Sequence, residues 1–380
     1  MGEVFLKQIP SYDVDTINDA ILKGFSSLGI DIKNEVRGKR VLLKPNLLGA
    51  YPPEKAVTTH PSLVEAILKI LKGCDCEIWM GDSPNGVQNS LEEIWEKTGM
   101  DDLARRYGVL RKFFEREGAE WVGELLISKP VLEADYIINL PKLKTHSLMT
   151  MTSAVKNMFG IVPGLKKASY HKISKTPKDF ATWLVKIAES RRPDLNIVDG
   201  ITAMAGNGPS AGYPVNLGLL AIGRDMYDID YLLASILNIK PEETETLKAA
   251  KLLGFTDLKP PVVKGDDASL FDTSTFKLPV TYSLKVSHTR FFNYLVNAFI
   301  GRLSISPKVN KRRCKRCGAC IKICPASAIK KTKDGYPEIA RKMCIQCYCC
   351  HEACPHRAID LRESLMLRLN KWISSKLRAK

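Results

Sequence analysis

Eight of the nine cysteines between residues 314 and 354 occur in two copies of one spacing pattern. Each copy reads C-x2-C-x2-C-x3-C-P, and the second begins 30 residues after the first. In this pattern three thiolates on one loop bind one [4Fe-4S] cluster, and the fourth cysteine binds the cluster of the other copy. The predicted ligands are Cys314, Cys317, Cys320 and Cys354 for one cluster, and Cys344, Cys347, Cys350 and Cys324 for the other. A pair of zinc sites is the alternative, but tetrahedral zinc sites take four ligands each and do not require eight cysteines that interleave in this way. The segment therefore predicts a small α+β ferredoxin domain with two oxygen-sensitive clusters.

Three further cysteines fit no ligand position of this pattern. We interpret Cys349 as a thiol packed beside a cluster, with ligand exchange or a redox role as the alternative. Cys74 and Cys76 precede an apolar run, which favours burial at the start of a strand. Between the two copies, residues 334–335 read Asp-Gly and predict a hairpin turn. We expect each cluster loop to be followed by a short helix.

The formal charge of +16 is concentrated in the same part of the chain. Residues 301–380 carry 20 Lys and Arg against 5 Asp and Glu, which accounts for +15 of the total. This confinement disfavours nucleic acid as a partner and suggests an acidic redox protein, because complementary charge steers association. No apolar stretch is long enough to cross a bilayer, and the N-terminus lacks the features of a secretion signal. The sequence therefore predicts a cytoplasmic protein.

In the first 303 residues, short apolar segments alternate with helical patterns. The apolar segments cover residues 41–43, 77–80, 136–138, 195–198 and 219–222, and each runs into a polar loop. Helices are predicted over residues 63–72, from 90 to about 99, and over 178–190. This alternation predicts an α/β domain with a parallel sheet, in which ligands bind beyond the carboxyl ends of the strands.

The polar loops contain the candidate residues for such a site. They are Lys44, Asn46, Asp82, Ser83, Lys142, Lys144, His146, Lys156, Asn157, Asp199, Asn207, Arg224, Asp225 and Asp230. The excess of lysine over acid suits an anionic group such as phosphate or carboxylate. We take Lys144 and His146 as the catalytic candidates, with His146 as a general acid–base. The alternatives are that the lysines are solvated loop charges, and that the aspartates hold them in place or bind a cation.

Two other histidines accompany this set. His60 fits the start of a helix, and His171 lies on a Lys-rich segment that could close over a ligand. The chain contains no G-x-G-x-x-G motif, Walker loop or nucleophile elbow. Nucleotide hydrolysis and serine hydrolase chemistry are therefore disfavoured.

The remaining segments connect and follow these domains. Residues 241–303 form a connecting region with helical patterns at 242–253 and 291–300, and the domain boundary is expected within 304–311. The ferredoxin domain should cover 304–360. Residues 361–380 alternate apolar and basic side chains at helical spacing and predict a basic amphipathic helix. Such a helix would dock onto the α/β domain or make peripheral contact with a membrane.

Together these motifs resemble the bacterial and archaeal proteins grouped as domain of unknown function 362, many of which are fused to a two-cluster ferredoxin. The matching segments are LKPN at 43–46, GDSP at 81–84, NLPKLKTH at 139–146, KNxxG at 156–160, DG at 199–200, GNGPS at 206–210 and CIQCYCC at 344–350. The resemblance implies a catalytic-looking α/β domain distantly similar to the lactate racemase catalytic family. One departure is the Met-Tyr pair at 226–227, where the family has Pro-Val.

The leading functional hypothesis is an iron–sulfur oxidoreductase. Electrons would pass between the clusters and an anionic substrate or an anionic organic redox cofactor, of flavin or deazaflavin type, at the edge of the sheet. One alternative is a non-catalytic electron carrier whose α/β domain docks a partner protein. A second alternative is a racemase-like isomerase or ligand-binding module.

Overall fold

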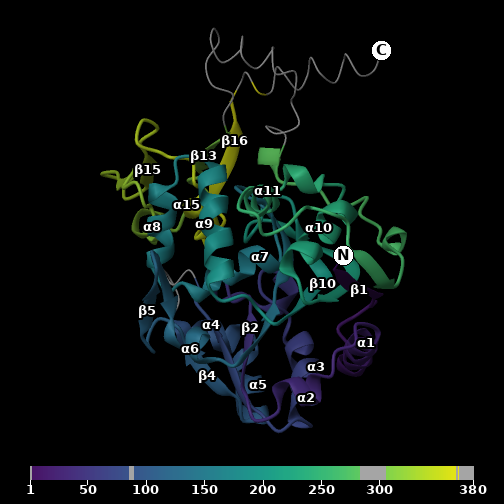
Figure 1. The fold of residues 1–380 in the computed structure, drawn as a ribbon. Coiled ribbons are helices and arrows are strands. Elements are labelled where there is room, and N and C mark those ends of the chain that lie inside the picture. Colours follow the sequence, from purple (N-terminus) through teal and green to yellow (C-terminus); the bar gives the residue numbers. More distant parts are fainter. Residues whose placement is uncertain (1, 85–89, 283–304, 365–366, 368–380) are drawn as a thin grey trace, which may run out of the picture.

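The computed structural model describes residues 2–84, 90–282, 305–364 and 367, and its larger domain is built on a ten-stranded mixed sheet (Figure 1). The strands are β1 (Glu3–Gln8), β2 (Arg40–Pro45), β3 (Glu77–Asp82), β4 (Leu110–Phe113), β7 (Tyr136–Leu140), β8 (Lys142–His146), β9 (Thr150–Thr152), β10 (Leu195–Ala205), β11 (Tyr213–Gly223) and β12 (Val262–Gly265). Their order is β12-β1-β11-β10-β7-β2-β3-β4, and β8 and β9 branch from β10. Strands β10, β7, β2, β3 and β4 are parallel.

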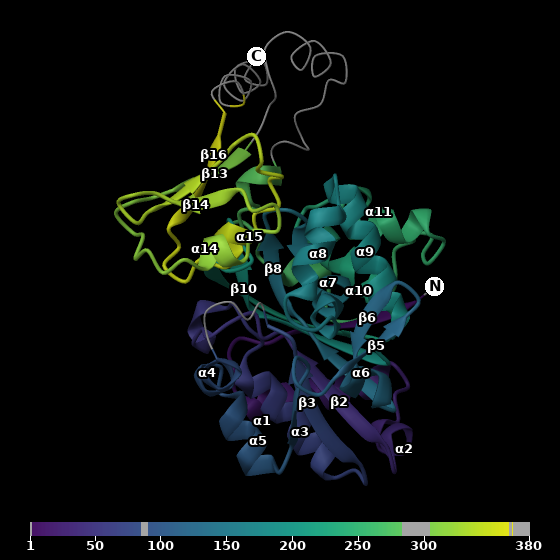
Figure 2. The ribbon, with the colours of Figure 1, turned by 90° about the vertical axis from the view of Figure 1, so that its left-hand side faces the viewer.

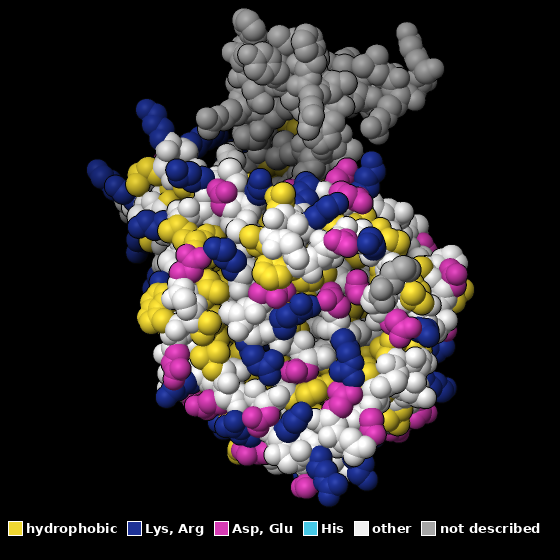
Figure 3. All heavy atoms as spheres, in the orientation of Figure 1, with side chains coloured by type: hydrophobic (Ala, Val, Ile, Leu, Met, Phe, Trp, Pro, Cys, Tyr) yellow, Lys and Arg dark blue, Asp and Glu magenta, His cyan; other side chains and the backbone are white. Residues whose placement is uncertain are grey.

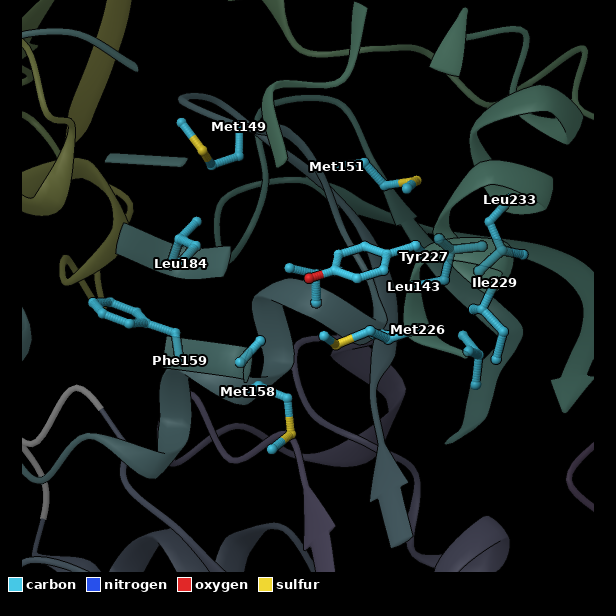
Figure 4. Packing of buried hydrophobic residues seen from close by; sticks show 14 of the residues in the cluster. Leu143, Met149, Met151, Met158, Phe159, Leu184, Met226, Tyr227, Ile229 and Leu233 are labelled. Carbon is cyan, nitrogen blue, oxygen red and sulfur yellow. The ribbon is translucent and has the colours of Figure 1, made fainter. Parts of the chain in front are cut away.

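Helices cover both faces of the sheet. One face packs against α1 (Val14–Ser27), α2 (Ile32–Val36), α3 (Pro61–Lys72), α4 (Leu91–Lys97) and α5 (Met100–Tyr107). The other packs against α6 (Lys129–Glu133), α7 (Ala154–Asn157), α8 (Lys166–Ile173), α9 (Pro177–Ser190), α10 (Met226–Ile236) and α11 (Glu245–Leu252). Successive residues of β2 point to opposite faces, so Val41 and Leu43 enter one core while Leu42 enters the other. Figure 4 shows part of the second core, where Met151, Met158 and Tyr227 meet between the sheet and its helices.

All five predicted strands are present, and the predicted helices form where their capping residues begin them. Thr176 and Asp179 make a complete capping box at the start of α9. The ring of His60 accepts a hydrogen bond at the start of α3, as expected for a helix start. One expectation was wrong: the strand at 219–222 belongs to β11, which runs antiparallel to β10. The loop after β11 therefore emerges at the opposite edge of the sheet from the loops after the parallel strands.

The Cys-rich domain consists of two small antiparallel sheets and two short helices. Strand β13 (Ile305–Val309) pairs with β16 (Ile359–Glu363), and β14 (Ile329–Lys331) pairs with β15 (Pro337–Ile339) through the predicted turn at Gly335. The helices α14 (Ala319–Lys322) and α15 (Cys349–Glu352) lie inside the cysteine motifs, so the helices predicted after the motifs are wrong and strands occupy those places. Figure 2 shows α14 and α15 on the side of this domain that faces β8 and β10.

The ends of the predicted domains are only partly visible. Residues 361–363 continue β16, so the basic helix cannot begin at 361, and most of 364–380 lies outside the described residues. The helical pattern at 291–300 also lies outside them, whereas the pattern at 242–253 corresponds to α11. Among the described residues, no helix is both long and apolar enough to span a bilayer.

Candidate functional site

The cluster-binding cysteines gather into two groups in the smaller domain. The thiol of Cys320 lies in the electrostatic field of Cys354, Cys314 and Cys317, and that of Cys344 lies in the field of Cys347 and Cys324. Cys320, Cys350 and Cys354 form a buried core with Ile329 and Ile359. Within the described part of the chain, no three His, Cys, Asp or Glu side chains converge on a position for a single metal ion.

The backbone of the two cysteine motifs repeats as closely as the sequence. Arg316 and Gln346 have φ of 57° and 55°, and Gly318 and Tyr348 have φ of 80° and 62°. At the end of each motif a backbone N–H donates to sulfur, at 3.3 Å on Cys324 and 3.1 Å on Cys354. Such N–H···S bonds stabilise the negative charge of a bound cluster and tune its potential. The two motifs therefore form equivalent cluster cradles.

A small cavity lies where the two domains meet, beyond the carboxyl ends of the parallel strands. Its volume is about 70 Å³, and β2, β3, β8, α7, α8 and α15 contribute to its wall. The charged side chains that line it are Lys144, Lys156, Lys167, Asp82 and Glu352. Ile323 and Cys349 of the ferredoxin domain complete one side. Six of the fourteen predicted site residues thus line one cavity, and a second domain closes it. The six are Asn46, Asp82, Ser83, Lys144, Lys156 and Asn157. We call it the anion cavity.

A row of buried amides holds Lys144 at the wall of the anion cavity. Lys144 Nζ donates to Asn46 Oδ1 at 2.7 Å and also to a backbone carbonyl. Asn46 Nδ2 donates to Asn157 Oδ1, Asn157 Nδ2 to Asn139 Oδ1, and Asn139 Nδ2 to Asn196 Oδ1, over distances of 2.9, 2.8 and 2.8 Å. Each amide orients the next, so the position of Lys144 depends on the loop after β2, on α7 and on the strands β7 and β10.

Lys156 differs from Lys144 and Lys167 because, in the part of the chain that the structure describes, its amine has neither a hydrogen-bond partner nor an ion-pair partner. Among the described residues no side chain forms a hydrogen bond or ion pair with its amine, whose contact is with the ring of Phe159 at 5.7 Å. Burial lowers the pKa of Lys156, and the fields of Glu352 and Cys349 oppose this effect. Among the described residues, the nearby buried atoms Thr152 Oγ1 and His171 Nδ1 also lack hydrogen-bond partners. A buried cation beside unused polar atoms is the arrangement expected around an anionic ligand.

Two other predicted lysines are neutralised inside the protein. Lys44 Nζ forms an ion pair with Asp82 at 2.8 Å, and Lys142 Nζ forms one with Asp199 at 2.8 Å. Asp199 also accepts a hydrogen bond from the hydroxyl of Tyr12 at 2.7 Å. Lys44, Lys142 and Asp199 have no exposed surface. Of the alternatives for the aspartates, the structure thus supports the one in which they hold lysines in place.

Arg224, Asp225 and Asn207 also lie away from the lining of the anion cavity. Arg224 and Asp225 follow β11 at the opposite edge of the sheet, where they bind Glu35 and Arg192. Their assignment to the site is corrected because it assumed a parallel strand. Asn207 lies at the domain junction, where its side chain accepts from a backbone N–H and its carbonyl lies 3.1 Å from His351 Nε2.

His146 is buried, and its ring supports a turn. Nδ1 accepts hydrogen bonds from the backbone N–H groups of Leu148 and Met149 at 3.0 and 3.2 Å. Nε2 lies 3.2 Å from Glu352 Oε1. Burial and nearby positive charges hold the pKa of His146 well below its usual value. An acid–base role of His146 stays a prediction, and its visible role is to shape the connection between β8 and β9.

Asp82 and Ser83 at the end of β3 connect the cavity to α8. Lys167 Nζ donates to Ser83 Oγ at 2.6 Å, and Ser83 Oγ donates to Glu115. Asp230 instead binds the N–H groups that begin α7, at 2.8 and 3.3 Å. Lys167 and Glu352 were absent from the predicted set. Lys167 could have been found from its Lys-rich segment, but nothing in the ferredoxin motif indicates that Glu352 faces another domain.

Gly160 allows α7 and its following turn to approach the Lys44–Asp82 ion pair. A methyl group on Gly160 would lie 2.0 Å from Asp82 Oδ1 and 2.7 Å from Lys44 Nζ. We therefore expect Gly160→Ala to lower the free energy of unfolding by about 1–3 kcal/mol, because a packed interior cannot absorb the methyl without strain. Urea denaturation under anaerobic conditions measures this change. The control is Gly73→Ala, whose methyl would meet only Ile70 O at 3.4 Å. If Gly160→Ala and Gly73→Ala unfold at the same urea concentration, the Lys44–Asp82 ion pair can move aside for the methyl group, and the expectation is wrong.

Comparisons with known proteins agree with both domains. A family model described as domain of unknown function 362 matches residues 41–235, and a model described as a 4Fe-4S dicluster domain matches residues 313–364. A thylakoid-associated protein of Synechocystis is 38% identical over 224 residues, which cover 57% of this chain and 68% of that protein.

Two solved structures show more distant similarity. The lactate racemase apoprotein from Thermoanaerobacterium thermosaccharolyticum is 16% identical with a TM-score of 0.38, and the match covers 67% of this chain. A protein from Thermotoga maritima is 14% identical with a TM-score of 0.35, and that match covers 58% of this chain. The chain spans 57% of the length of each of these structures. The family matches are decisive: the chain belongs to the family named domain of unknown function 362 and carries a 4Fe-4S dicluster ferredoxin domain at its C-terminal end.

Proposed function

We propose that this protein is an iron–sulfur oxidoreductase in which the ferredoxin clusters exchange electrons with a small anion bound at Lys156. The observation that carries this proposal is the anion cavity itself. It places Lys156, a buried lysine with no ion-pair partner among the described residues, close to Cys349, which lies between two predicted ligands of the second cluster. A bound anion would therefore lie beside the part of the chain that holds the second cluster. We expect electrons to pass directly between that cluster and the anion.

The two clusters would form a short path from solvent to the anion cavity. Cys317, a ligand of the first cluster, is exposed, whereas α15 of the second motif packs against the α/β domain. Ser210 Oγ donates to the backbone carbonyl of Glu352 at 2.7 Å and fixes this contact. An external donor would thus reduce the first cluster, and the second cluster would reduce the bound molecule.

The size and charge of the anion cavity suggest the class of molecule. A volume of about 70 Å³ suits a carboxylate or oxyanion of a few heavy atoms. A tricyclic flavin or deazaflavin ring is too large for this space. We therefore do not place the anionic organic cofactor expected from the sequence in the anion cavity. Mass spectrometry of the small molecules released from anaerobically purified protein tests the proposal. A small carboxylate or oxyanion lost in Lys156→Met supports it, and unchanged retention in that variant contradicts it.

Anion affinity should fall as the pH rises above 7. Burial, with repulsion from Lys156 and Lys142, lowers the pKa of Lys144 to about 7, although Glu352 and Asp82 act in the opposite direction. A bound anion favours protonated Lys144, so binding takes up a proton and affinity falls by up to about tenfold per pH unit above this pKa. Titration calorimetry with acetate between pH 6 and pH 9 measures this slope.

Lys167 also affects this pH profile, and the variant Lys144→Met is its control. The pKa of Lys167 is lowered to about 8 by burial, so it adds to the loss only at higher pH. Lys144→Met should bind acetate weakly and without the step near pH 7. If the step persists in Lys144→Met, another group is responsible for it.

The charge of the ferredoxin domain suggests an acidic redox protein as the electron donor. Figure 3 shows dark blue Lys and Arg side chains projecting from this domain at the upper left, with few acidic groups among them. Over the rest of that face the two signs are mixed. We expect the rate of electron transfer from an acidic ferredoxin or flavodoxin to fall steeply with added salt. Stopped-flow kinetics between low and physiological ionic strength measures it, and a salt-independent rate would contradict this docking mode.

A further inference from the structure

A second cavity lies on the other side of His171 and has a different character. Its volume is about 310 Å³, which is in the range of sites for organic molecules with several rings. Cys347, a ligand of the second cluster, forms part of its wall, together with Leu148, Phe180, Ile345 and Tyr348. A molecule held there would contact a cluster ligand directly. We call this space the ring cavity.

The wall of the ring cavity also carries neutral polar side chains, among them Ser147, Thr150 and Gln346, and one lysine, Lys175. His171 lines both cavities, its ring stacks on Phe180 with centroids 3.9 Å apart, and its buried Nδ1 has no hydrogen-bond partner among the described residues. Burial lowers the pKa of His171 to about 3, so the imidazole is neutral and offers one donor and one acceptor. Apolar side chains such as Leu148, Phe180 and Ile345 beside several hydrogen-bonding groups suit a planar ring with carbonyl oxygens.

The backbone beside the ring cavity is held in an unusual conformation. Thr150, which lines the cavity, has a φ of 72°, a left-handed conformation that β-branched residues rarely adopt. The turn before it is fixed by the hydrogen bonds of His146 and by Ser147, which donates to the carbonyl of Gly208. Strain of this kind persists where the surrounding structure enforces it, often at binding sites.

We infer that the ring cavity binds a planar two-electron redox carrier, of the carbonyl-bearing ring chemistry that quinones and flavins share. For a quinone, the electrons and protons balance as follows. Each reduced cluster gives one electron and returns to its oxidised form, two protons come from water at the cavity mouth, and the quinone becomes a hydroquinone. The electrons come from a low-potential one-electron protein donor. This inference requires the clusters and does not depend on the anion cavity.

The test uses menadione and lumiflavin as probes of the full-length, cluster-loaded protein. Anaerobic equilibrium binding of each probe is measured, followed by its reduction by protein that dithionite has reduced. Ser174 lies at the rim of the ring cavity, so Ser174→Trp should block it and weaken binding at least tenfold. Lys178→Trp is the matched control, because Lys178 is exposed on α9 outside the lining. His171→Phe keeps an aromatic ring and should weaken binding about tenfold by removing a hydrogen bond.

The outcomes separate this inference from the proposed function. Saturable binding of either probe that is lost in Ser174→Trp, kept in Lys178→Trp and kept in Lys156→Met supports the ring cavity, and the tighter probe identifies the ring class. Iron content and the electron paramagnetic resonance spectrum must be unchanged in all four variants. Binding that is equal in Ser174→Trp and Lys178→Trp overturns the inference, as does the absence of saturable binding by both probes. Loss of probe binding in Lys156→Met would place the ring in the anion cavity and would also overturn it.

Discussion

Cys354→Ser is expected to remove one of the two clusters, so that iron and sulfide each fall from about eight to about four per chain. Cys354 lies beside Cys320 in the buried core of the ferredoxin domain, although 30 residues separate it from the first motif. The spacing pattern assigns it as the fourth ligand of the first cluster. Iron and acid-labile sulfide analysis after anaerobic purification measures the loss.

The matched control for this variant is Cys349→Ser in the same part of the chain. Cys349 is buried and interacts with the side chain of Cys347, but it occupies no ligand position. We expect Cys349→Ser to keep about eight iron atoms. If Cys349→Ser loses iron while Cys354→Ser retains it, the ligand assignment is wrong.

Lys142→Met is expected to lower the free energy of unfolding by about 3–5 kcal/mol, because it leaves Asp199 buried without its cationic partner. Both side chains of this ion pair have no exposed surface. Tyr12 and the backbone N–H of His60 would still donate to Asp199, but neither supplies a positive charge. Urea denaturation followed by the fluorescence of the α/β domain measures the shift.

Lys156→Met provides the contrast within the same domain. Lys156 has no ion-pair partner among the described residues, so its removal should leave stability nearly unchanged. Loss of a charge-assisted contact should instead weaken anion binding by roughly ten- to a hundredfold. Equal destabilisation by Lys142→Met and Lys156→Met would contradict this division between structural and binding lysines.

The 4Fe-4S dicluster domain could be predicted from the sequence because the cysteine spacing is local and chemically specific. Four thiols within eleven residues and a following proline leave few other functions for the segment. The predicted strands and the capped helices of the α/β domain are also present, since each carries its own apolar pattern or capping residues. These are short-range features of the chain.

The sequence could not separate structural from binding lysines, because their partners are distant along the chain. Lys142 and Asp199 are 57 residues apart, and in the sequence alone nothing distinguishes Lys142 from Lys156. The direction of β11 was equally hidden, because an apolar run has the same composition whether its strand is parallel or antiparallel. Asp225 was misplaced for that reason. The closure of the anion cavity by Glu352 depends on how two domains dock, which no local motif encodes.

The central claim is that an anion bound at Lys156 communicates with a cluster, and electron paramagnetic resonance of the reduced protein tests it most directly. Spectra are recorded with and without bicarbonate or acetate, which match the size of the anion cavity. We predict that the signal of one cluster shifts on anion addition in the parent protein and does not shift in Lys156→Met. The account is contradicted if neither anion changes the spectrum of the parent protein, or if the cluster signal shifts equally in the parent protein and in Lys156→Met.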